Sequence, residues 1–266
     1  MRSPIVTVTI QKASGASGEE RTAAQDYIAV EEPLQIRLAK RDLAITMRTP
    51  GHDRELAAGF LFTEGILSSP SQVASIDADE RGTITVRPKA GVDAGAESRH
   101  FYVTSSCGVC GKASIEALHA AGCNSLAGIL PHIRANVILS LPEKLRSAQQ
   151  VFEHTGGLHA AGLFRADGEL LELREDVGRH NAVDKLIGAA FLAGQLPLHN
   201  CILMLSGRVS FELVQKAVMA GIPAVAAVGA PSSLATETAR RFGVTLIGFL
   251  RDRRFNIYSG EVRLAS

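Results

Sequence analysis

The stretch that decides the fold runs from residue 201 to residue 250 and reads CILMLSGRVSFELVQKAVMAGIPAVAAVGAPSSLATETARRFGVTLIGFL. Three apolar runs in it, at 201–205, 223–228 and 244–250, have the length and composition of buried strands. Helical patterns at 209–220 and 233–242 separate these runs, and Gly221 and Gly243 are placed to end the two helices. Because alternating strands and helices favour parallel strands joined by right-handed crossovers, the stretch predicts a layered α/β domain.

The residues that precede this stretch divide into two parts. Helical patterns at 112–121, 143–152 and 182–192 are expected to belong to the same α/β domain. Nearer the N-terminus, strand patterns at 34–38, 43–47, 83–86 and 101–103 surround one helical pattern at 53–67. We therefore predict a β-rich (α+β) N-terminal segment, residues 1–104, followed by an α/β domain, residues 105–266.

Three connections in the N-terminal segment are expected to be irregular. Residues 13–24 are rich in Ser, Gly, Ala and Glu, a composition typical of a flexible or disordered connection. The pair Arg41-Asp42 lies where a hairpin turn would join two strands, and residues 89–99 are expected to form a mobile loop.

Polar and basic residues follow each of the three predicted strands at the end of the chain. They are Ser206-Gly207-Arg208, the loop 229–233 and the segment 251–254. Ligands of such sheets bind at the carboxyl ends of the strands, helix N-termini favour anions, and arginine suits phosphate. The edge thus favours a phosphorylated or nucleotide-like ligand, although ordinary turn residues and solvated arginines would give the same pattern. No phosphate loop with a Gly-Lys-Ser/Thr ending occurs, which argues against an ordinary nucleoside triphosphatase.

Composition excludes several classes of protein. The 266 residues carry a net charge of +1, whereas a general nucleic-acid binder has a large basic excess. The chain has no Trp and three Tyr, too few aromatic residues for an extended base-stacking platform. Its four cysteines are too few for a disulfide scaffold, and no segment reads as a signal peptide or a membrane span. We therefore expect a cytoplasmic protein with reduced cysteines, without nucleic-acid or membrane partners.

The pair Cys107 and Cys110 is the strongest chemical signal. The run CGVCGK at 107–112 lies between a predicted strand and a predicted helix, so a thiolate there would gain from the helix N-terminus and from Lys112. A structural zinc site needs four ligands, usually two such cysteine pairs. Because Cys123 and Cys201 do not form a second pair, we do not expect a structural zinc site. A thioredoxin-like dithiol, a persulfide carrier and two small buried residues at a turn are the interpretations left open.

Weaker candidates lie between Cys123 and Cys201. In the run TGGLHA at 155–160, the glycines either end a helix before a strand at His159 or bring the backbone close to a ligand. Asp176, His180 and Asp184 have helical spacing, but Gly178 disfavours a helix there and Asn181 is typical of an N-cap, so we expect no metal site. Cys123 and Cys201 are expected to be packing residues.

These motifs, taken in order, resemble those of the formate dehydrogenase accessory sulfurtransferases of the FdhD type. The matching pieces are SSCGVCG at 105–111, TGGLHA at 155–160, REDVGRHNAVDK at 174–185, SGR at 206–208 and the segment 249–254. The run at 174–185 is the most specific, and residues 1–100 match more loosely. The resemblance covers nearly the whole chain.

The resemblance implies a sulfur carrier that formate dehydrogenase requires. Such a protein moves sulfur from a cysteine desulfurase to the molybdenum cofactor in its bis(guanine dinucleotide) form. By position, Cys107 would hold the persulfide and Cys110 would assist it or resolve it. The cofactor would contact the residues Phe249, Leu250, Arg251, Asp252, Arg253 and Arg254.

The resemblance also implies a three-layer fold similar to cytidine deaminases for the large domain, and a homodimer. The deaminase zinc signature is absent, so we expect no deamination. Two other functions stay open at this point: a thiol–disulfide oxidoreductase that needs both cysteines, and a chaperone that binds the cofactor without transferring sulfur.

Overall fold

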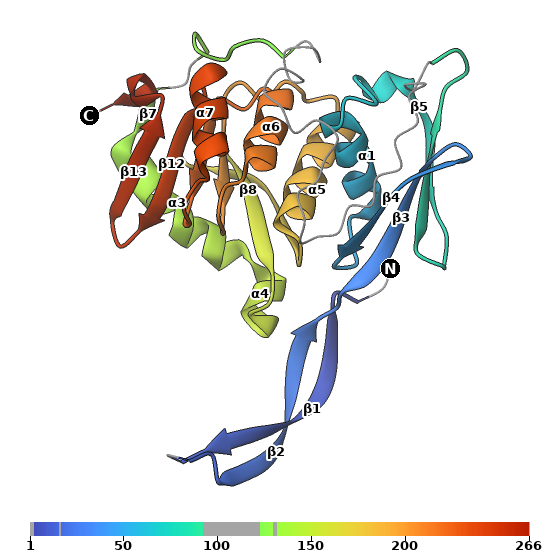
Figure 1. Cartoon of the computed structure of the whole chain (residues 1–266), viewed down its shortest axis with the longest axis vertical. Helices are drawn as coiled ribbons and strands as arrows, with labels where there is room; N and C mark the ends of the chain where they lie inside the picture. Colours follow the sequence, from blue (N-terminus) through green and yellow to red (C-terminus); the bar gives the residue numbers. More distant parts are fainter. Residues whose placement is uncertain (1–2, 16, 93–122, 130–131, 266) are drawn as a thin grey trace.

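The computed structural model describes residues 3–15, 17–92, 123–129 and 132–265 (Figure 1). A six-stranded sheet in the order β13-β12-β11-β10-β8-β9 forms its centre. The strands are β8 (His159–Arg165), β9 (Leu170–Asp176), β10 (Cys201–Leu205), β11 (Ala224–Ala227), β12 (Thr245–Arg251) and β13 (Arg254–Ser259). β10, β11 and β12 are parallel, as the sequence predicts, and β8, β9 and β13 are antiparallel to their neighbours.

Helices cover both faces of this sheet because successive residues of its buried strands point to opposite sides. Leu203 and Leu205 of β10 belong to the larger core, which they share with α5 (Arg179–Leu192), α6 (Phe211–Met219) and α7 (Ser233–Arg241). Ile202 and Met204 belong to a second core under α3 (Ala135–Ala148). The result is a mixed α/β fold with three layers. Within the described residues, no helix combines the length and apolar character needed to cross a bilayer.

A smaller sheet in the order β4-β3-β6-β5 packs beside the larger one. Its strands are β3 (Glu32–Leu38), β4 (Arg41–Arg48), β5 (Val73–Ala78) and β6 (Thr83–Pro88). Between β4 and β5 the chain forms α1 (Asp53–Thr63) and the short helix η1 (Pro70–Gln72). The predicted small sheet with one helix is therefore confirmed, although α1 ends at Thr63 rather than at residue 67. At the other end of the chain, β7 (Ile133–Arg134), η2 (Glu261–Arg263) and β14 (Leu264–Ala265) complete the fold, with β14 pairing β7.

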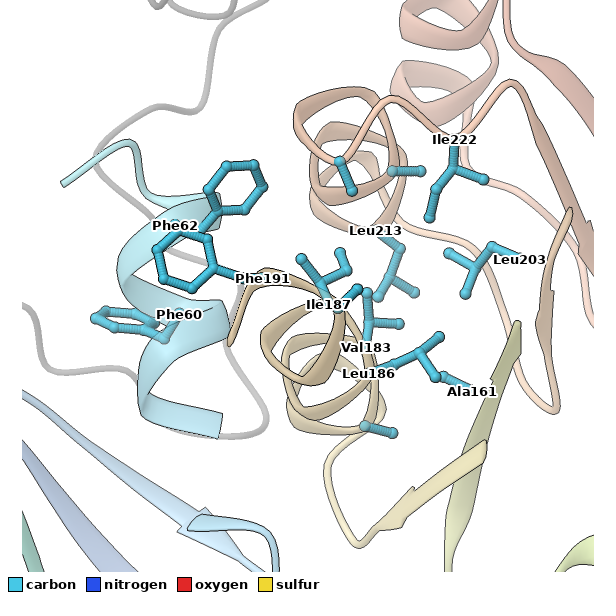
Figure 2. Packing of buried hydrophobic residues seen from close by; sticks show 14 of the residues in the cluster. Phe60, Phe62, Ala161, Val183, Leu186, Ile187, Phe191, Leu203, Leu213 and Ile222 are labelled. Atoms are coloured by element: carbon cyan, nitrogen blue, oxygen red, sulfur yellow. The ribbon is translucent and has the colours of Figure 1, made fainter. Parts of the chain in front are cut away.

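Two glycines let α1 and α5 touch backbone to backbone. A Cβ added at Gly59 would lie 1.9 Å from the carbonyl oxygen of Asp184, and one at Gly188 would lie 1.8 Å from that of Glu55. The ring of Phe62 lies 5.4 Å from that of Phe191 beside this crossing, as Figure 2 shows. One continuous apolar core therefore joins the small sheet to the large one. The boundary at 104/105 stays a prediction.

The flexible connection expected at 13–24 is wrong. The strands β1 (Ile5–Ser14) and β2 (Glu20–Ala29) form a two-stranded ribbon, paired from Ile5↔Ala29 to Ser14↔Glu20. The ribbon projects away from the rest of the molecule (Figure 1). Its composition misleads because ladder hydrogen bonds come from the backbone, which polar and small residues supply as well as apolar ones.

Three further expectations need correction or lie outside the described residues. The helix expected at 143–152 is two helices, α3 and α4 (Gln150–Thr155), which meet at Gln149, and Pro142 lies inside α3 instead of preceding a helix. The turn expected at Arg41-Asp42 lies just before it, where Ala39 has a φ of 53°, and β4 begins at Arg41. The strand expected at 101–103, the helix at 112–121 and most of the loop at 89–99 lie outside the described residues.

Candidate functional site

The loops that follow β10, β11 and β12 meet at one edge of the large sheet, as predicted. The Gly229 amide donates to the Gly207 carbonyl at 3.1 Å, and the Phe249 amide donates to the Gly229 carbonyl at 3.1 Å. The first two loops open α6 and α7, and the Ser232 hydroxyl caps α7 by accepting from the Ala235 amide. Gly229 has no room for a side chain, because a Cβ there would lie 2.8 Å from the Gly207 carbonyl oxygen.

The start of β8 brings His159 to the same edge. The Ala160 amide donates to the Ser206 hydroxyl at 2.8 Å, and the Ser206 amide donates to the Ala160 carbonyl at 3.0 Å. A Cβ at Gly207 would lie 3.2 Å from Nδ1 of His159, so the imidazole packs directly over that glycine. Gly156, with a φ of 64°, ends α4. Gly156 therefore ends a helix, and His159 lies at the edge where the strand-end loops meet.

The first turn of α5 contributes His180, which is mostly buried. Its Nε2 lies 3.0 Å from the Ser210 hydroxyl and 3.4 Å from a carboxylate oxygen of Glu212. Burial lowers its pKa to about 4, Glu212 opposes this shift, and the positive charges of Lys216 and Arg179 add to it. Burial also lowers the pKa of His159, with Arg179 and Arg208 adding to the effect and Asp176 opposing it. The edge therefore presents two neutral imidazoles beside two arginines at pH 7.

Much of the run 174–185 holds the scaffold together. Asp176 is fully buried, lies 2.7 Å from the Lys185 ammonium, and accepts hydrogen bonds from the amides of Thr49 and Gly178. The Asn181 side chain donates to Asp176 at 3.0 Å and to the Met47 carbonyl at 2.7 Å. The expectation that Asn181 caps a helix is wrong, because α5 begins at Arg179 after an N-cap at Gly178.

Asp184 has a separate buried partner. Both of its carboxylate oxygens accept from the Lys216 ammonium at 2.9 Å, and one also accepts from the Thr63 hydroxyl at 2.9 Å. Asp176, His180 and Asp184 thus have three different sets of partners. Asp176 joins the end of β9 to α5 and to Thr49, His180 joins α5 to the start of α6, and Asp184 joins α5 to α6 and α1. No cluster of three or more His, Cys, Asp or Glu side chains suited to a metal ion occurs within the described residues.

The segment 249–254 forms the rim of the edge, where β12 turns into β13. Leu250 is buried in the second core, while Phe249 and residues 251–254 are exposed. Phe249, Asp252 and Arg253 adopt φ values of 51°, 53° and 55°, a left-handed conformation that is uncommon for residues other than glycine. The Arg251 guanidinium lies 5.9 Å from the centre of the Phe249 ring.

The described residues do not include Cys107 or Cys110, so the structure does not test their predicted role. Cys201 and Cys123 are packing residues, as predicted. Cys201 is buried at the start of β10, and burial raises the pKa of its thiol. Cys123 is half-buried against the larger core, with its sulfur 3.1 Å from that of Met219.

Sequence reasoning missed a cavity of about 400 Å³ that adjoins this edge. Arg146, Gln149 and Phe152, from α3, α4 and the joint between them, form one wall, and His159 and Ser206 lie on the side shared with the edge. No motif in the sequence points to these three residues. They reach the strand ends only because α3 ends and α4 begins at Gln149. Arg179 was also missed, although it lies within the run 174–185.

Comparisons with known proteins agree with the motifs. A model of the FdhD/NarQ family matches residues 29–265. The chain is 51% identical over 253 residues to a Streptomyces avermitilis protein named sulfur carrier protein FdhD, covering 90% of this chain and 89% of that one. It is 45% identical to a Sulfurisphaera tokodaii protein of the same name, covering 92% and 94%.

Solved structures are similar to this chain as well. A crystal structure from Desulfotalea psychrophila, described as that of a candidate formate dehydrogenase accessory protein, superposes with a TM-score of 0.77 at 26% identity. It covers 97% of this chain and 99% of that one.

Proposed function

The chain belongs to the FdhD/NarQ family, and we propose that it is a sulfur carrier that formate dehydrogenase requires. One observation of the fold supports this function best. Parts of the runs at 155–160, 174–185, 206–208 and 249–254, which are far apart in the sequence, meet at a single edge of the sheet. That edge carries neutral imidazoles, arginines and helix N-termini, a set of groups suited to an anionic ligand.

Cys107 is the residue that we propose to hold the sulfur. Its thiolate attacks the outer sulfur of a cysteine desulfurase persulfide, a new S–S bond forms, and the desulfurase cysteine leaves as a thiolate. The S–S bond of the Cys107 persulfide then breaks as its outer sulfur passes to the molybdenum of the substrate cofactor as a sulfido ligand. The molybdenum supplies the two electrons that this step requires, and Cys107 returns to the thiolate. Cys110 assists this cycle or resolves the persulfide.

The cofactor that receives the sulfur is proposed to be the bis(guanine dinucleotide) form. Its diphosphates suit Arg251, Arg253 and Arg254, whose exposed side chains stand at the rim of the edge. The Phe249 ring beside Arg251 offers a surface for stacking. We further propose that the protein works in the cytoplasm and that it forms a homodimer. We also propose that its large domain has an arrangement like that of cytidine deaminases.

Formate dehydrogenase activity in cells that lack this chain tests the function. Complementation with Cys107→Ala should leave the enzyme inactive, while wild type should restore it and Cys201→Ala, at a packing position, should restore it too. A Cys107→Ala variant that restores full activity would exclude the carrier role. If Cys107→Ser and Cys110→Ser abolish the activity equally, the thiol–disulfide oxidoreductase becomes the better explanation.

A further inference from the structure

The β1–β2 ribbon extends into solvent with little to hold it in place. Each of its strands has ten residues, and Figure 1 shows them projecting beyond the other described parts of the chain. At the base of the ribbon, the Tyr27 ring lies 6.3 Å from that of His154 in α4. None of the described residues in either apolar core belongs to the ribbon. Because a two-stranded hairpin alone is at most marginally stable in water, we expect another chain to cover this one.

One face of the ribbon is largely apolar. Since side chains alternate along a strand, Val6, Val8 and Ile10 lie on the same face of β1. Ile28 of β2 lies opposite Val6 and widens this face. Val6 is 44% exposed and Ile28 is 43% exposed. Asp26, opposite Val8, gives the face one charge on the β2 side. An exposed apolar face of this kind is typical of an interaction surface.

The outer edge of β1 presents backbone groups to solvent, since among the described strands β1 pairs with β2 alone. The Val30 amide donates to the Pro4 carbonyl, so these two residues form a hydrogen-bonded pair. Such pairs alternate with non-hydrogen-bonded pairs in an antiparallel ladder. The amides and carbonyls of Thr7 and Thr9 therefore point away from β2. Residues 5–11 include no charge and no proline, the usual devices that keep a further strand from pairing with an edge.

The sequence of β1 is complementary to a second copy of itself. The run VTVTI at 6–10 alternates Val or Ile with Thr and has the same pattern from either end. Two copies paired antiparallel about Val8 would place Val6 opposite Ile10 of the partner subunit, and the two Val8 side chains opposite each other. Cross-strand pairs of β-branched residues stabilise antiparallel strands. A two-fold dimer requires such a self-complementary surface, because the same patch serves both subunits.

We propose that the β1 edge of the ribbon is the dimer interface of this protein, where two ribbons form one four-stranded sheet with Val8 on the two-fold axis. A second copy is the partner because the edge is uncharged and has the same pattern in both directions. Apart from Ala29, the ribbon precedes the residues that the family model matches. The inference rests on the homodimer proposed above and adds the surface that forms it.

Sedimentation equilibrium of the whole chain over a range of concentrations tests the interface. Wild type should form dimers. Val8→Lys places two ammonium groups opposite each other on the axis and should raise the dissociation constant of the dimer at least tenfold. Ala23→Lys adds the same charge at an exposed residue on the other face of β2 and should associate as wild type does. Below the dissociation constant, where association adds nothing to stability, all three proteins should have the same thermal unfolding midpoint.

Cross-linking tests the register. Because Val8 forms its hydrogen bonds with β2, its pair across the axis is a non-hydrogen-bonded one, with Cα atoms about 4.5 Å apart. A disulfide spans that separation. Val8→Cys should therefore give a covalent dimer on mild oxidation, and Ala23→Cys should not. Both substitutions would be made in a chain that carries Cys107→Ser and Cys110→Ser.

Three results would overturn this interface. They are a wild-type monomer at every concentration, a dimer that is equally tight in Val8→Lys, and equal loss of association in Val8→Lys and Ala23→Lys. A covalent dimer of Ala23→Cys in place of Val8→Cys would overturn the register. Sulfur loading of Cys107, measured separately in wild type and Val8→Lys, distinguishes such a failure from failure of the carrier role.

Discussion

The burial of the His180 side chain makes the stability of the fold depend on pH. Its imidazole is packed against Ser210 and Glu212, and its pKa is about 4 in the folded chain against an ordinary value of 6.5. Between these two values the unfolded chain binds more protons than the folded one, so stability falls as the pH falls.

We therefore expect the free energy of unfolding to fall between pH 7 and pH 5 by about 2 kcal/mol more in wild type than in His180→Gln. Urea unfolding at the two pH values measures this difference. Parallel losses in the two proteins would show that His180 is not buried in its neutral form.

The pair of Asp184 and Lys216 predicts a large effect of one substitution. Burial acts to lower the pKa of Lys216, but the carboxylates of Asp184 and Glu212 outweigh it and raise that pKa. Lys216→Met leaves the Asp184 carboxylate buried without its cation, which should destabilise the fold by about 3–5 kcal/mol.

Urea unfolding again provides the measurement, with Lys40→Met as the control. Lys40 is exposed in the turn before β4, and its replacement should change stability by less than about 0.5 kcal/mol. Equal effects of the two substitutions would contradict the buried pair.

At the scale of elements, the crossing of α1 and α5 depends on the absence of side chains. Because a Cβ at Gly188 would lie 1.8 Å from the Glu55 carbonyl oxygen, Gly188→Ala must push the two helices apart. We expect a loss of about 3 kcal/mol or more in the free energy of unfolding. Ala189→Ser, one residue along α5 and partly exposed, should have little effect. A well-folded Gly188→Ala protein of wild-type stability would show that the helices do not touch there.

Elements differ in how far the sequence predicts them, for physical reasons. The strands at 201–205, 223–228 and 244–250 were identified because a strand buried on both faces is apolar throughout and is ended by glycine or proline. A single helix was predicted at 143–152, whereas α3 begins eight residues earlier and continues through Pro142, a residue that usually ends or kinks a helix. Packing against the rest of the fold determines where these two helices begin and end, and the local sequence does not predict such packing.

At the scale of the whole molecule, the β1–β2 ribbon should be dispensable for stability. None of the described residues in either apolar core belongs to it. Replacing residues 8–26 with Asn-Gly would join Thr7 to Tyr27, which are paired in the ribbon, through a tight turn. The free energy of unfolding should change by less than about 0.5 kcal/mol, measured by urea unfolding. A large loss would mean that residues 8–26 themselves help to stabilise the folded body.

The neighbours of several site residues can be identified only from the whole fold. The strand-end loops and the segment 249–254 could be placed at one edge from the order of strands and helices alone. His180 was noticed for its spacing as a metal ligand, yet its neighbours Ser210 and Glu212 come from α6, thirty residues away. Gln149 is unremarkable in the sequence, and only the fold shows that it is buried and lines the cavity between α3, α4 and the strand ends.

The central claim is that Cys107 carries sulfur, and intact-protein mass spectrometry tests it most directly. Wild type, Cys107→Ser and Cys110→Ser would each be incubated with a cysteine desulfurase and cysteine. We predict a gain of one sulfur atom, removable by reduction, in wild type and Cys110→Ser but not in Cys107→Ser. A gain in Cys107→Ser, no gain in any protein, or a loss of two hydrogens in wild type would contradict the claim.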